Sequence, residues 1–376
     1  MAAPPLDVSS ATAPLTPLSG DWKWQLRHAI RDVDALAAKL RLSPEERAGA
    51  LRAQQQGLPL AITPYYLGLA DPADPRCPIR LQAVPRAAEG QTVAGDMRDP
   101  LGEEQHLVAP HLVQRYPDRV LLLATDRCAV YCRYCTRSRM VGSGGGSTPL
   151  GQLQPALDHI KSHPEIADVI ISGGDPLVLS DGRLAELLSA LAAIDSVLYV
   201  RIASRTPVTL PQRITPELCR ALRSHPAPWL MTHFNHPREL TPESRAACAR
   251  LADHGIPVMN QCVLLRGVND DAATLEALFR GLVRTRVRPY YLLQADPVRG
   301  TGHLRTPLGQ GIELMAALQG RVSGIALPKL IVDTPGGRGK VPVGRDYIVA
   351  REGLTTTLRT HRGELVDYLD PPPEIR

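Results

Sequence analysis

The stretch RVLLLATDRCAVYCRYCTRSR, residues 119–139, decides the fold class that we expect for this chain. It opens with an apolar run that is typical of a buried strand. Cys128, Cys132 and Cys135 follow in a C-x3-C-x2-C spacing. Three thiolates on one loop can each hold one iron of a [4Fe–4S] cubane and leave the fourth iron without a protein ligand. The spacing therefore predicts a cluster that is open to an external ligand.

Three alternatives to this cluster have to be weighed. A structural zinc site normally takes four Cys or His ligands in paired spacing, and no second pair appears in the sequence. An electron-carrying ferredoxin would need a fourth cysteine at usable spacing, which is missing. Three plain buried thiols are the third alternative. The other cysteines stand alone and predict small buried hydrophobes instead of a disulfide framework: Cys77, Cys219, Cys248 and Cys262.

Charge and hydropathy exclude several classes of protein. Lys and Arg outnumber Asp and Glu by 43 to 38, and the basic residues are scattered. A nucleic-acid footprint is not indicated. No apolar run approaches the ~20 residues that cross a bilayer, and the first residues do not form a signal peptide. We expect a soluble, cytoplasmic protein with no membrane or nucleic-acid partner.

Composition and periodicity divide the chain into four regions. Residues 1–20 are rich in Pro, Ala and Ser and predict a disordered tail. Apolar residues recur at helical spacing from Asp21 to about Leu51, with SPEE at Ser43 as a helix start. We assign residues 21–110 to an N-terminal helical region, residues 111–320 to the main domain and residues 321–376 to a C-terminal segment.

Six β-rich runs alternate with helical stretches in the main domain: RVLLLAT, ADVIIS, LYVRIAS, PWLMTHF, VMNQCVLL and RPYYLLQAD. This alternation favours a parallel sheet, which can curl into a whole or partial barrel. Barrel chemistry lies at the carboxyl ends of the strands. Polar residues end or follow the runs: Thr125 and Asp126, Ser172 to Asp175, Ser204 to Thr206, His233, Asn269 and Asp270, and Asp296. We predict an α/β fold, a partial (β/α)6 barrel of the TIM type with an N-terminal helical region and a C-terminal extension.

Two further loops attract attention. ISGGDPL follows the second run, and its glycines, Gly173 and Gly174, would let the backbone approach the polar groups of a ligand. An ordinary strand-to-helix turn is the alternative. DTPGGRGKVP, residues 333–342, does not match a nucleotide-binding loop, because a threonine replaces the first glycine and Val341 follows the lysine. A desolvated Lys340 could form a Schiff base with an aldehyde cofactor, and a solvated surface lysine is the alternative.

Taken in order, these motifs resemble the lysine 2,3-aminomutase family of the radical S-adenosylmethionine superfamily. The resemblance runs from DWKWQ to the lysine loop and covers most of the chain. The segments between are DPL at Asp99, RYPDRVLLL at Arg115, CAVYCRYCTRSR, SGGDPL, RTPVTLPQRITPEL at Arg205, THFNHP at Thr232 and NQCVLLRGVND at Asn260. The resemblance implies a [4Fe–4S] cluster, S-adenosyl-L-methionine and pyridoxal 5′-phosphate as cofactors.

The resemblance also implies roles for matching residues. The three loop cysteines would hold the cluster, and Lys340 would be the catalytic lysine that binds pyridoxal phosphate. Near the phosphate of that cofactor would lie Arg115, Tyr116 and Arg119. The adenosylmethionine positions would be Ser172, Gly173, Gly174, Asp175, Ser204, Arg205, His233 and Asn235.

Three residues would recognise the substrate. Arg137 matches the carboxylate-binding arginine of the family, and a planar guanidinium suits a bidentate carboxylate. Asp296 and Asp333 match the pair that holds the distal ammonium of lysine. Two carboxylates would repel an acidic side chain, so the pair favours a basic amino acid. As isolated residues, both aspartates are more commonly helix caps or turn residues.

The function that the resemblance implies is L-lysine 2,3-aminomutase, which interconverts L-α-lysine and β-lysine by a 5′-deoxyadenosyl radical mechanism on a pyridoxal phosphate external aldimine. The implied partners are L-lysine, an electron donor such as flavodoxin or ferredoxin, and further copies of the chain in a homo-oligomer. The alternatives are an aminomutase of another amino acid such as arginine, the branch that makes β-lysine for elongation factor P, a radical RNA-modifying enzyme and an iron–sulfur electron carrier.

Three positions depart from the family pattern. Tyr134 replaces a histidine, Ser138 replaces an arginine, and Arg338 replaces a glycine inside PGGGGK. Arg338 can alter how the lysine loop approaches a phosphate or a substrate. The C-terminal cysteines that bind zinc in some longer relatives do not occur in this sequence, so we expect no zinc.

Overall fold

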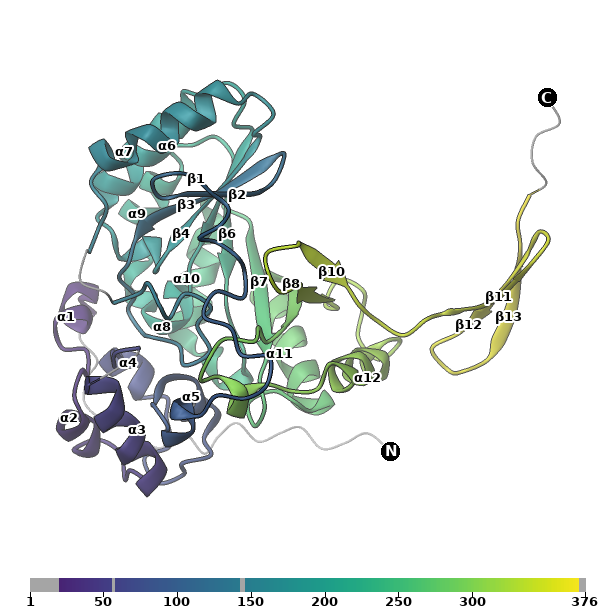
Figure 1. Ribbon diagram of the computed structural model, residues 1–376, viewed down its shortest axis with the longest axis horizontal. Coiled ribbons are helices and arrows are strands. Elements are labelled where there is room, and N and C mark those ends of the chain that lie inside the picture. Colours follow the sequence, from purple (N-terminus) through teal and green to yellow (C-terminus); the bar gives the residue numbers. More distant parts are fainter. Residues whose placement is uncertain (1–19, 56–57, 143–145, 372–376) are drawn as a thin grey trace.

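One ten-stranded sheet organises the chain in the computed structural model, which describes residues 20–55, 58–142 and 146–371. The strands lie in the sheet in the order in which they occur in the sequence, from β1 to β10. The tail expected at residues 1–20 falls outside the described residues except for Gly20. Figure 1 shows the sheet with its helices as the body of the molecule and a thin arm leading away from it.

The parallel part of the sheet confirms the six predicted strands and continues with β9, which leads into the lysine loop. Its members are β3 (Arg119–Thr125), β4 (Asp168–Gly173), β5 (Tyr199–Ala203), β6 (Pro228–Thr232), β7 (Val258–Leu264), β8 (Val287–Gln294) and β9 (Lys329–Asp333). The helices between them are α6 (Leu150–Ser162), α7 (Asp181–Ala192), α8 (Thr206–Thr209), α9 (Pro216–Leu222), α10 (Pro242–Asp253), α11 (Ala272–Arg284) and α12 (Leu308–Leu318). Neighbouring parallel strands are joined by such crossover connections, so the carboxyl ends of all these strands lie at the same edge of the sheet.

Helix α11 illustrates why these segments fold as they do. Asp271 caps its first turn by accepting a hydrogen bond from the Thr274 amide at 2.9 Å. Leu275, Leu278 and Phe279 recur at helical spacing and are buried in the main core, which they share with the strand side chains.

Short helices make up the N-terminal region: α1 (Trp22–Arg27), α2 (Val33–Ala37), α3 (Pro44–Gln55), α4 (Pro64–Leu67) and α5 (Pro78–Ala83). The predicted helix start at Ser43 is confirmed. Its hydroxyl accepts from the Glu46 amide, and the Glu46 carboxylate accepts from the Ser43 amide, which is a capping box. The described residues also form five 3-10 helices: η1 (Ala87–Gly90), η2 (Pro176–Val178), η3 (Pro211–Arg213), η4 (Pro237–Glu239) and η5 (Gly302–Leu304).

The sheet extends past both region boundaries that the sequence suggested. β2 (Leu112–Tyr116) pairs antiparallel with β3, and β1 (Leu107–Ala109) pairs antiparallel with β2, so the sheet begins ahead of residue 111. β9 pairs with β8 in parallel, and β10 (Lys340–Pro342) returns antiparallel to β9, so residues beyond 320 also belong to it. The sheet is continuous across these boundaries because strands that are distant in the sequence pair through their backbones. The periodicity of the sequence does not predict such pairing.

A second sheet forms the arm at the C-terminal end. It consists of β11 (Ile348–Glu352), β12 (Thr355–Arg359) and β13 (Leu365–Leu369) in antiparallel order. Figure 1 shows it standing clear of the body. In the part of the chain that the structure describes, no helix is long and apolar enough to cross a membrane.

Candidate active site

The loop after β3 brings its three cysteines together. Cys128, Cys132 and Cys135 are half-buried and close enough for each thiol to influence the ionisation of another. Burial, with a smaller contribution from Cys132, raises the pKa of the Cys135 thiol to about 11. Burial also raises the pKa of Cys128. Iron binding at these thiols would therefore have to displace protons.

The arrangement of the thiols bears on the kind of metal centre. Within the described ranges, no three Cys, His, Asp or Glu side chains converge on a point where one metal ion could bind. The thiols of a cubane do not need to converge in this way, since each bonds a different iron. The donor set of three soft thiols in a loop thus fits a cluster better than a single ion.

Arg205, which follows β5, lies against the cysteine loop. Its Nη1 donates to Cys132 Sγ at 2.8 Å, and its Nη2 donates to the Tyr66 hydroxyl and to Glu239 Oε1 at 2.9 and 2.8 Å. The guanidinium is therefore shared between one cysteine sulfur and a buried polar network. A hydrogen bond to a cluster sulfur is one of the features that set a cluster's reduction potential.

The glycines of SGGDPL approach the protein's own backbone. A Cβ on Gly173, where φ is +112°, would lie 2.2 Å from Thr125 O, and one on Gly174 would lie 2.3 Å from Arg127 O. The Gly174 and Asp175 amides donate to these same carbonyls at 2.6 and 2.7 Å. The turn thus packs tightly against the start of the cysteine loop. Only glycine is small enough to allow this contact.

Asp175 is committed to holding this turn. Its carboxylate accepts from the Ser204 hydroxyl at 2.6 Å, the Arg205 amide at 2.8 Å and the Leu177 amide at 3.0 Å. Burial raises its pKa in spite of these donors. The structure therefore joins the ends of β4 and β5 through this carboxylate, and its oxygens face the protein.

His233 and Asn235, which follow β6, differ in whether their side-chain polar atoms have hydrogen-bond partners. The Asn235 amide donates to Gln82 Oε1 at 3.0 Å and to the Tyr134 hydroxyl at 2.7 Å, so it is a structural group. His233 stacks on the Tyr134 ring with centroids 5.6 Å apart. Among the described residues its Nε2 is buried without a hydrogen-bond partner. Burial, aided by Arg205, lowers its pKa to about 3, so the ring is neutral.

The lysine loop connects β9 to β10 as a tight hairpin. Asp333 and Lys340 face each other across the two strands, and Thr334 closes the loop by donating to Gly339 O through its amide and its hydroxyl. A Cβ on Gly337, where φ is +72°, would lie 2.5 Å from Leu101 O. The hairpin therefore presses on the DPL segment, and glycine is needed for both the turn and the contact.

Lys340 sits in a set of charged groups. Its Nζ is ion-paired with Asp333, which also pairs with Arg115 Nη1 at 3.2 Å. The Lys340 amide donates to the Tyr116 hydroxyl at 2.8 Å. The structure thus confirms that residues from β2, β9 and β10 meet here. It also shows Arg115 occupied by a carboxylate at the position where a phosphate contact is expected.

Asp296 and Arg119 lie near this set. Burial, followed by the repulsion of Asp333, raises the pKa of Asp296 from 3.8 to about 7. Lys340 and Arg115 oppose that rise, which places Asp296 within electrostatic reach of both. Arg119 stacks on the Tyr116 ring at 3.7 Å and pairs with the exposed Asp118.

Arg137 connects the cysteine loop to the rest of the site. Its Nη1 donates to the Ser172 hydroxyl at 3.1 Å, and its Nε and Nη2 lie 2.9 and 2.8 Å from Glu103 Oε1. Glu103 is buried and was not among the predicted site residues.

Residues 99–104 form a bridge that sequence reasoning missed. Asp99 and Glu103 both pair with Arg139, at 3.1 and 3.4 Å. Pro100 O accepts from the Gly336 amide of the lysine loop at 2.8 Å. The bridge therefore ties the cysteine loop to the lysine loop. The available signal was charge: DPLGEE carries three acids, and CTRSR carries two arginines of the opposite charge.

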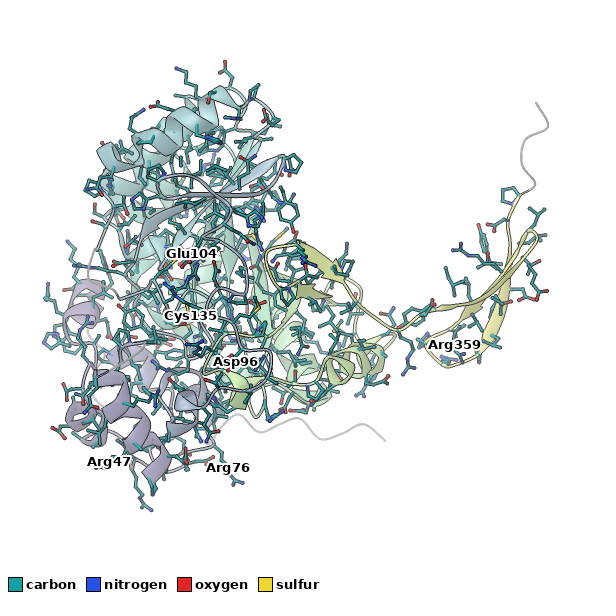
Figure 2. The ribbon with its side chains drawn as sticks, in the orientation of Figure 1. Arg47, Arg76, Asp96, Glu104, Cys135 and Arg359 are labelled. Carbon is teal, nitrogen blue, oxygen red and sulfur yellow. The ribbon has the colours of Figure 1, made fainter. Side chains whose placement is uncertain are left out.

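In Figure 2, Cys135 and Glu104 are labelled over the centre of the body, far from Arg359 on the arm. The site groups thus lie in the body, at the edge of the sheet where the parallel strands end. Arg137 and the bridge connect the cysteine loop to the lysine loop there. This arrangement can hold a metal cluster beside an amine and a pair of carboxylates.

Comparisons with known proteins agree with this arrangement. Residues 122–278 match the family model of the radical SAM superfamily, and residues 315–375 match the model described as lysine-2,3-aminomutase. The chain is 46% identical over 351 residues to the L-lysine 2,3-aminomutase of Fusobacterium nucleatum, which covers 93% of this chain and 82% of that protein.

Two further relatives extend the comparison. The L-lysine 2,3-aminomutase of Clostridium subterminale is 47% identical over 93% of this chain and 84% of its own length. The glutamate 2,3-aminomutase of Clostridioides difficile is 41% identical over 94% of this chain and 84% of its own length. The family expected from the motifs is confirmed: this chain belongs to the lysine 2,3-aminomutase family of radical SAM proteins.

Proposed function

We propose that the chain is an L-lysine 2,3-aminomutase, which moves the 2-amino group of free L-lysine to carbon 3. The observation that carries the proposal is the pair of carboxylates, Asp296 and Asp333, beside Lys340. A partly buried pair of acids is a site for a cation, and the distal ammonium of lysine supplies one.

The pair also distinguishes between substrates within the family. A relative of this chain bears the name glutamate 2,3-aminomutase, so membership of the family does not fix the substrate. A carboxylate-bearing side chain would be repelled by Asp296 and Asp333, whereas lysine would neutralise them. Two relatives with identities of 46% and 47% bear the name L-lysine 2,3-aminomutase.

Arg137 is the proposed contact for the α-carboxylate of the substrate. Glu103 takes up its Nε–Nη2 edge, and Ser172 accepts from Nη1. These two contacts fix the plane of the guanidinium. A guanidinium held in one plane loses less conformational entropy when it binds a carboxylate.

The residues present suit the cofactors that the family implies. We propose that Cys128, Cys132 and Cys135 hold a [4Fe–4S] cluster, that Lys340 carries pyridoxal 5′-phosphate, and that S-adenosyl-L-methionine binds between them. When bound, these groups would supply the radical chemistry and hold the migrating nitrogen. The proposed adenosylmethionine positions are Ser172, Gly173, Gly174, Asp175, Ser204, Arg205, His233 and Asn235. The free Nε2 of neutral His233 is the one orphaned polar side-chain atom among these described positions, and it suits a ligand that forms a hydrogen bond there.

The chain's own groups would bind the substrate and move one proton. Asp296, with a pKa of about 7, is partly protonated near neutrality. An ammonium brought against it favours the ionised carboxylate. Lysine binding would therefore release a proton from Asp296, while Arg115, Tyr116 and Arg119 would hold the phosphate side of the cofactor.

The arm supports a homo-oligomer. Leu365, Val366, Tyr368 and Leu369 are 50% to 72% exposed on β13, and neighbours along a strand point to opposite faces. An exposed three-stranded sheet with apolar residues on both faces is a surface for association. We propose that further copies of the chain cover it.

We further infer that the six βα units form a partial (β/α)6 barrel spanning residues 111–320, followed by a segment at 321–376 that brings in Lys340. All seven cysteines lie in the described residues and are free thiols, as is usual in a reducing cytoplasm. The cluster would receive its electron there from flavodoxin or ferredoxin.

The test is an anaerobic assay of the reconstituted protein with L-lysine, L-arginine, L-glutamate and L-alanine. Separation of the derivatised amino acids should show a new β-amino acid from lysine and from none of the acidic or apolar substrates. Lys340→Ala is the matched control and should yield none. Turnover of glutamate in preference to lysine would refute the substrate assignment, and turnover of arginine in preference would assign the pair to a guanidinium.

A further inference from the structure

An arginine-lined cavity lies directly behind the cysteine loop. It has a volume of about 290 Å³ and lies between α3, the loop that carries the cysteines and the segment that follows β8. Five arginines and one glutamate are among its lining residues: Arg52, Arg98, Arg133, Arg139, Arg299 and Glu89. None of the substrate and cofactor residues proposed above lines it.

The cavity carries unbalanced positive charge on its open side. Arg133 pairs with Glu89, which also lines the cavity, and Arg139 pairs with Asp99 and Glu103. Arg52 and Arg299 are exposed and form no ion pair with any described residue. Arg98 is 73% exposed and pairs with Glu104 across 3.6 Å. Guanidiniums that protrude without acids create a potential that attracts anions.

The wall of the cavity is continuous with the cysteines. Arg133, Ser138 and Arg139 belong to the cysteine loop itself, and the Ser138 amide donates to Cys135 O at 3.2 Å. Leu58, also on the wall, belongs to a buried apolar cluster against which Cys128 and Cys135 pack. The cavity wall and the thiols thus share the cysteine loop and this apolar cluster.

We propose that this cavity is where an acidic electron-donor protein of the flavodoxin or ferredoxin class docks. The inference rests on the proposed function, because it needs the cluster at the three cysteines. The cavity is too small to hold a protein domain. The donor would therefore bind over the opening of the cavity and insert acidic side chains into it. The reduced donor loses one electron and the cluster gains it, and no bond forms or breaks.

The charge pattern favours a protein over a small anion. Arg52 and Arg299 come from two different segments on the rim and are exposed, whereas the arginines deeper in the wall already have acidic partners. Exposed complementary charges mainly accelerate encounter and set orientation between two proteins. A buried site for a small anion would leave the deeper guanidiniums free.

The test compares two reductants on the holoenzyme. In Arg52→Glu/Arg299→Glu, the second-order rate constant for cluster reduction by reduced flavodoxin should fall about tenfold or more at low salt, with a shallower salt dependence. Stopped-flow detection of the flavodoxin semiquinone measures it. Reduction by the small methyl viologen radical cation should not slow. The control Arg220→Glu/Arg284→Glu changes the net charge equally on exposed residues of α9 and α11 and should keep the wild-type rate.

Each other outcome has a defined meaning. An unchanged rate with flavodoxin, or an equal loss in the control, would overturn the docking site. Slower reduction by viologen would point to damage at the cluster and would overturn it as well. Binding of inorganic phosphate that is lost in the variant, without any change in the flavodoxin rate, would make the cavity a small-anion site. Failure of the wild-type chain to assemble a cluster would instead refute the proposed function.

Discussion

Arg137 and Glu103 form a partly buried ion pair, with Nη2 2.8 Å from Oε1 and side-chain exposures of 16% and 4%. The arginine follows the last cysteine of the loop, and the glutamate belongs to the bridge that holds the lysine loop. The pair therefore connects the two halves of the site. It also fixes the guanidinium that is proposed to bind the substrate carboxylate.

Glu103→Gln should loosen that guanidinium, because it removes the charge that Arg137 pairs with, whereas Arg139 keeps Asp99 as a partner. We expect a loss of about 3 kcal/mol in the free energy of unfolding, because one partner of a buried pair has been neutralised. The KM of every substrate should rise, with kcat less affected. Urea titration and steady-state kinetics measure both. Glu104→Gln is the matched control, because Glu104 is 58% exposed and should matter little. An unchanged KM in Glu103→Gln would mean that Arg137 does not depend on this contact.

Replacing Cys128, Cys132 or Cys135 with Ala should abolish cluster assembly and adenosylmethionine cleavage, and pyridoxal phosphate should remain bound. The reason is that the cysteine loop follows β3 whereas Lys340 begins β10. Iron content and cofactor absorbance report the two groups separately. Cys219→Ala, a change at a buried cysteine of α9, should keep its iron. Normal activity in any of the three loop variants would refute the cluster assignment.

Lys340→Ala should lose covalently bound pyridoxal phosphate and still assemble the cluster. Borohydride reduction followed by peptide mapping should place the pyridoxyl group on Lys340 in the wild-type chain. Lys329, exposed at the start of β9, is the internal comparison. A pyridoxyl group on Lys329 would show that the lysine loop has been assigned wrongly.

Neutralising either carboxylate of the ammonium site should weaken the use of lysine. Loss of one partner of a buried ion pair costs ~3–5 kcal/mol, which corresponds to a few hundredfold or more in kcat/KM. Asp296→Asn and Asp333→Asn should each show this loss for lysine. Arg137→Lys should impair all substrates alike, because every α-amino acid carries the α-carboxylate. Wild-type efficiency in both aspartate variants would rule out lysine recognition by this pair and leave the aminomutase reaction in place.

The raised pKa of Asp296 should make stability depend on pH. The folded chain holds a proton on this carboxyl up to pH about 7, whereas the unfolded chain releases it near its ordinary value of 3.8. Folding therefore takes up a proton between these values, and stability falls as pH rises through this window. Asp296→Asn should remove the penalty and raise the free energy of unfolding of the cofactor-free protein at pH 8 by an amount on the order of 3 kcal/mol. Near pH 4 the two proteins should be alike. Equal stabilities at pH 8, measured by urea titration, would show that Asp296 is ionised without cost.

The sequence by itself determined the strands and the local spacing of the residues that we propose for the chemistry. Six apolar runs predicted six parallel strands because buried strands need continuous apolar residues, which are visible in one dimension. The spacing of Cys128, Cys132 and Cys135 is likewise local, since three ligands on one short loop are close together in any fold. Lys340 was identifiable because its glycine-rich turn and its resemblance to a family are also local features.

Only the tertiary structure decided how those residues are held. The contact of the SGGDPL glycines with the Thr125 and Arg127 backbone was not predicted, because φ preferences do not say which backbone lies opposite. Glu103 was missed because its partner Arg137 lies 34 residues away, and an ion pair at that separation leaves no periodic signal. The pKa of Asp296 depends on burial and on Asp333, neither of which can be read along the chain. Residue types and local spacing thus determine which groups are present, and long-range contacts determine what each group can do.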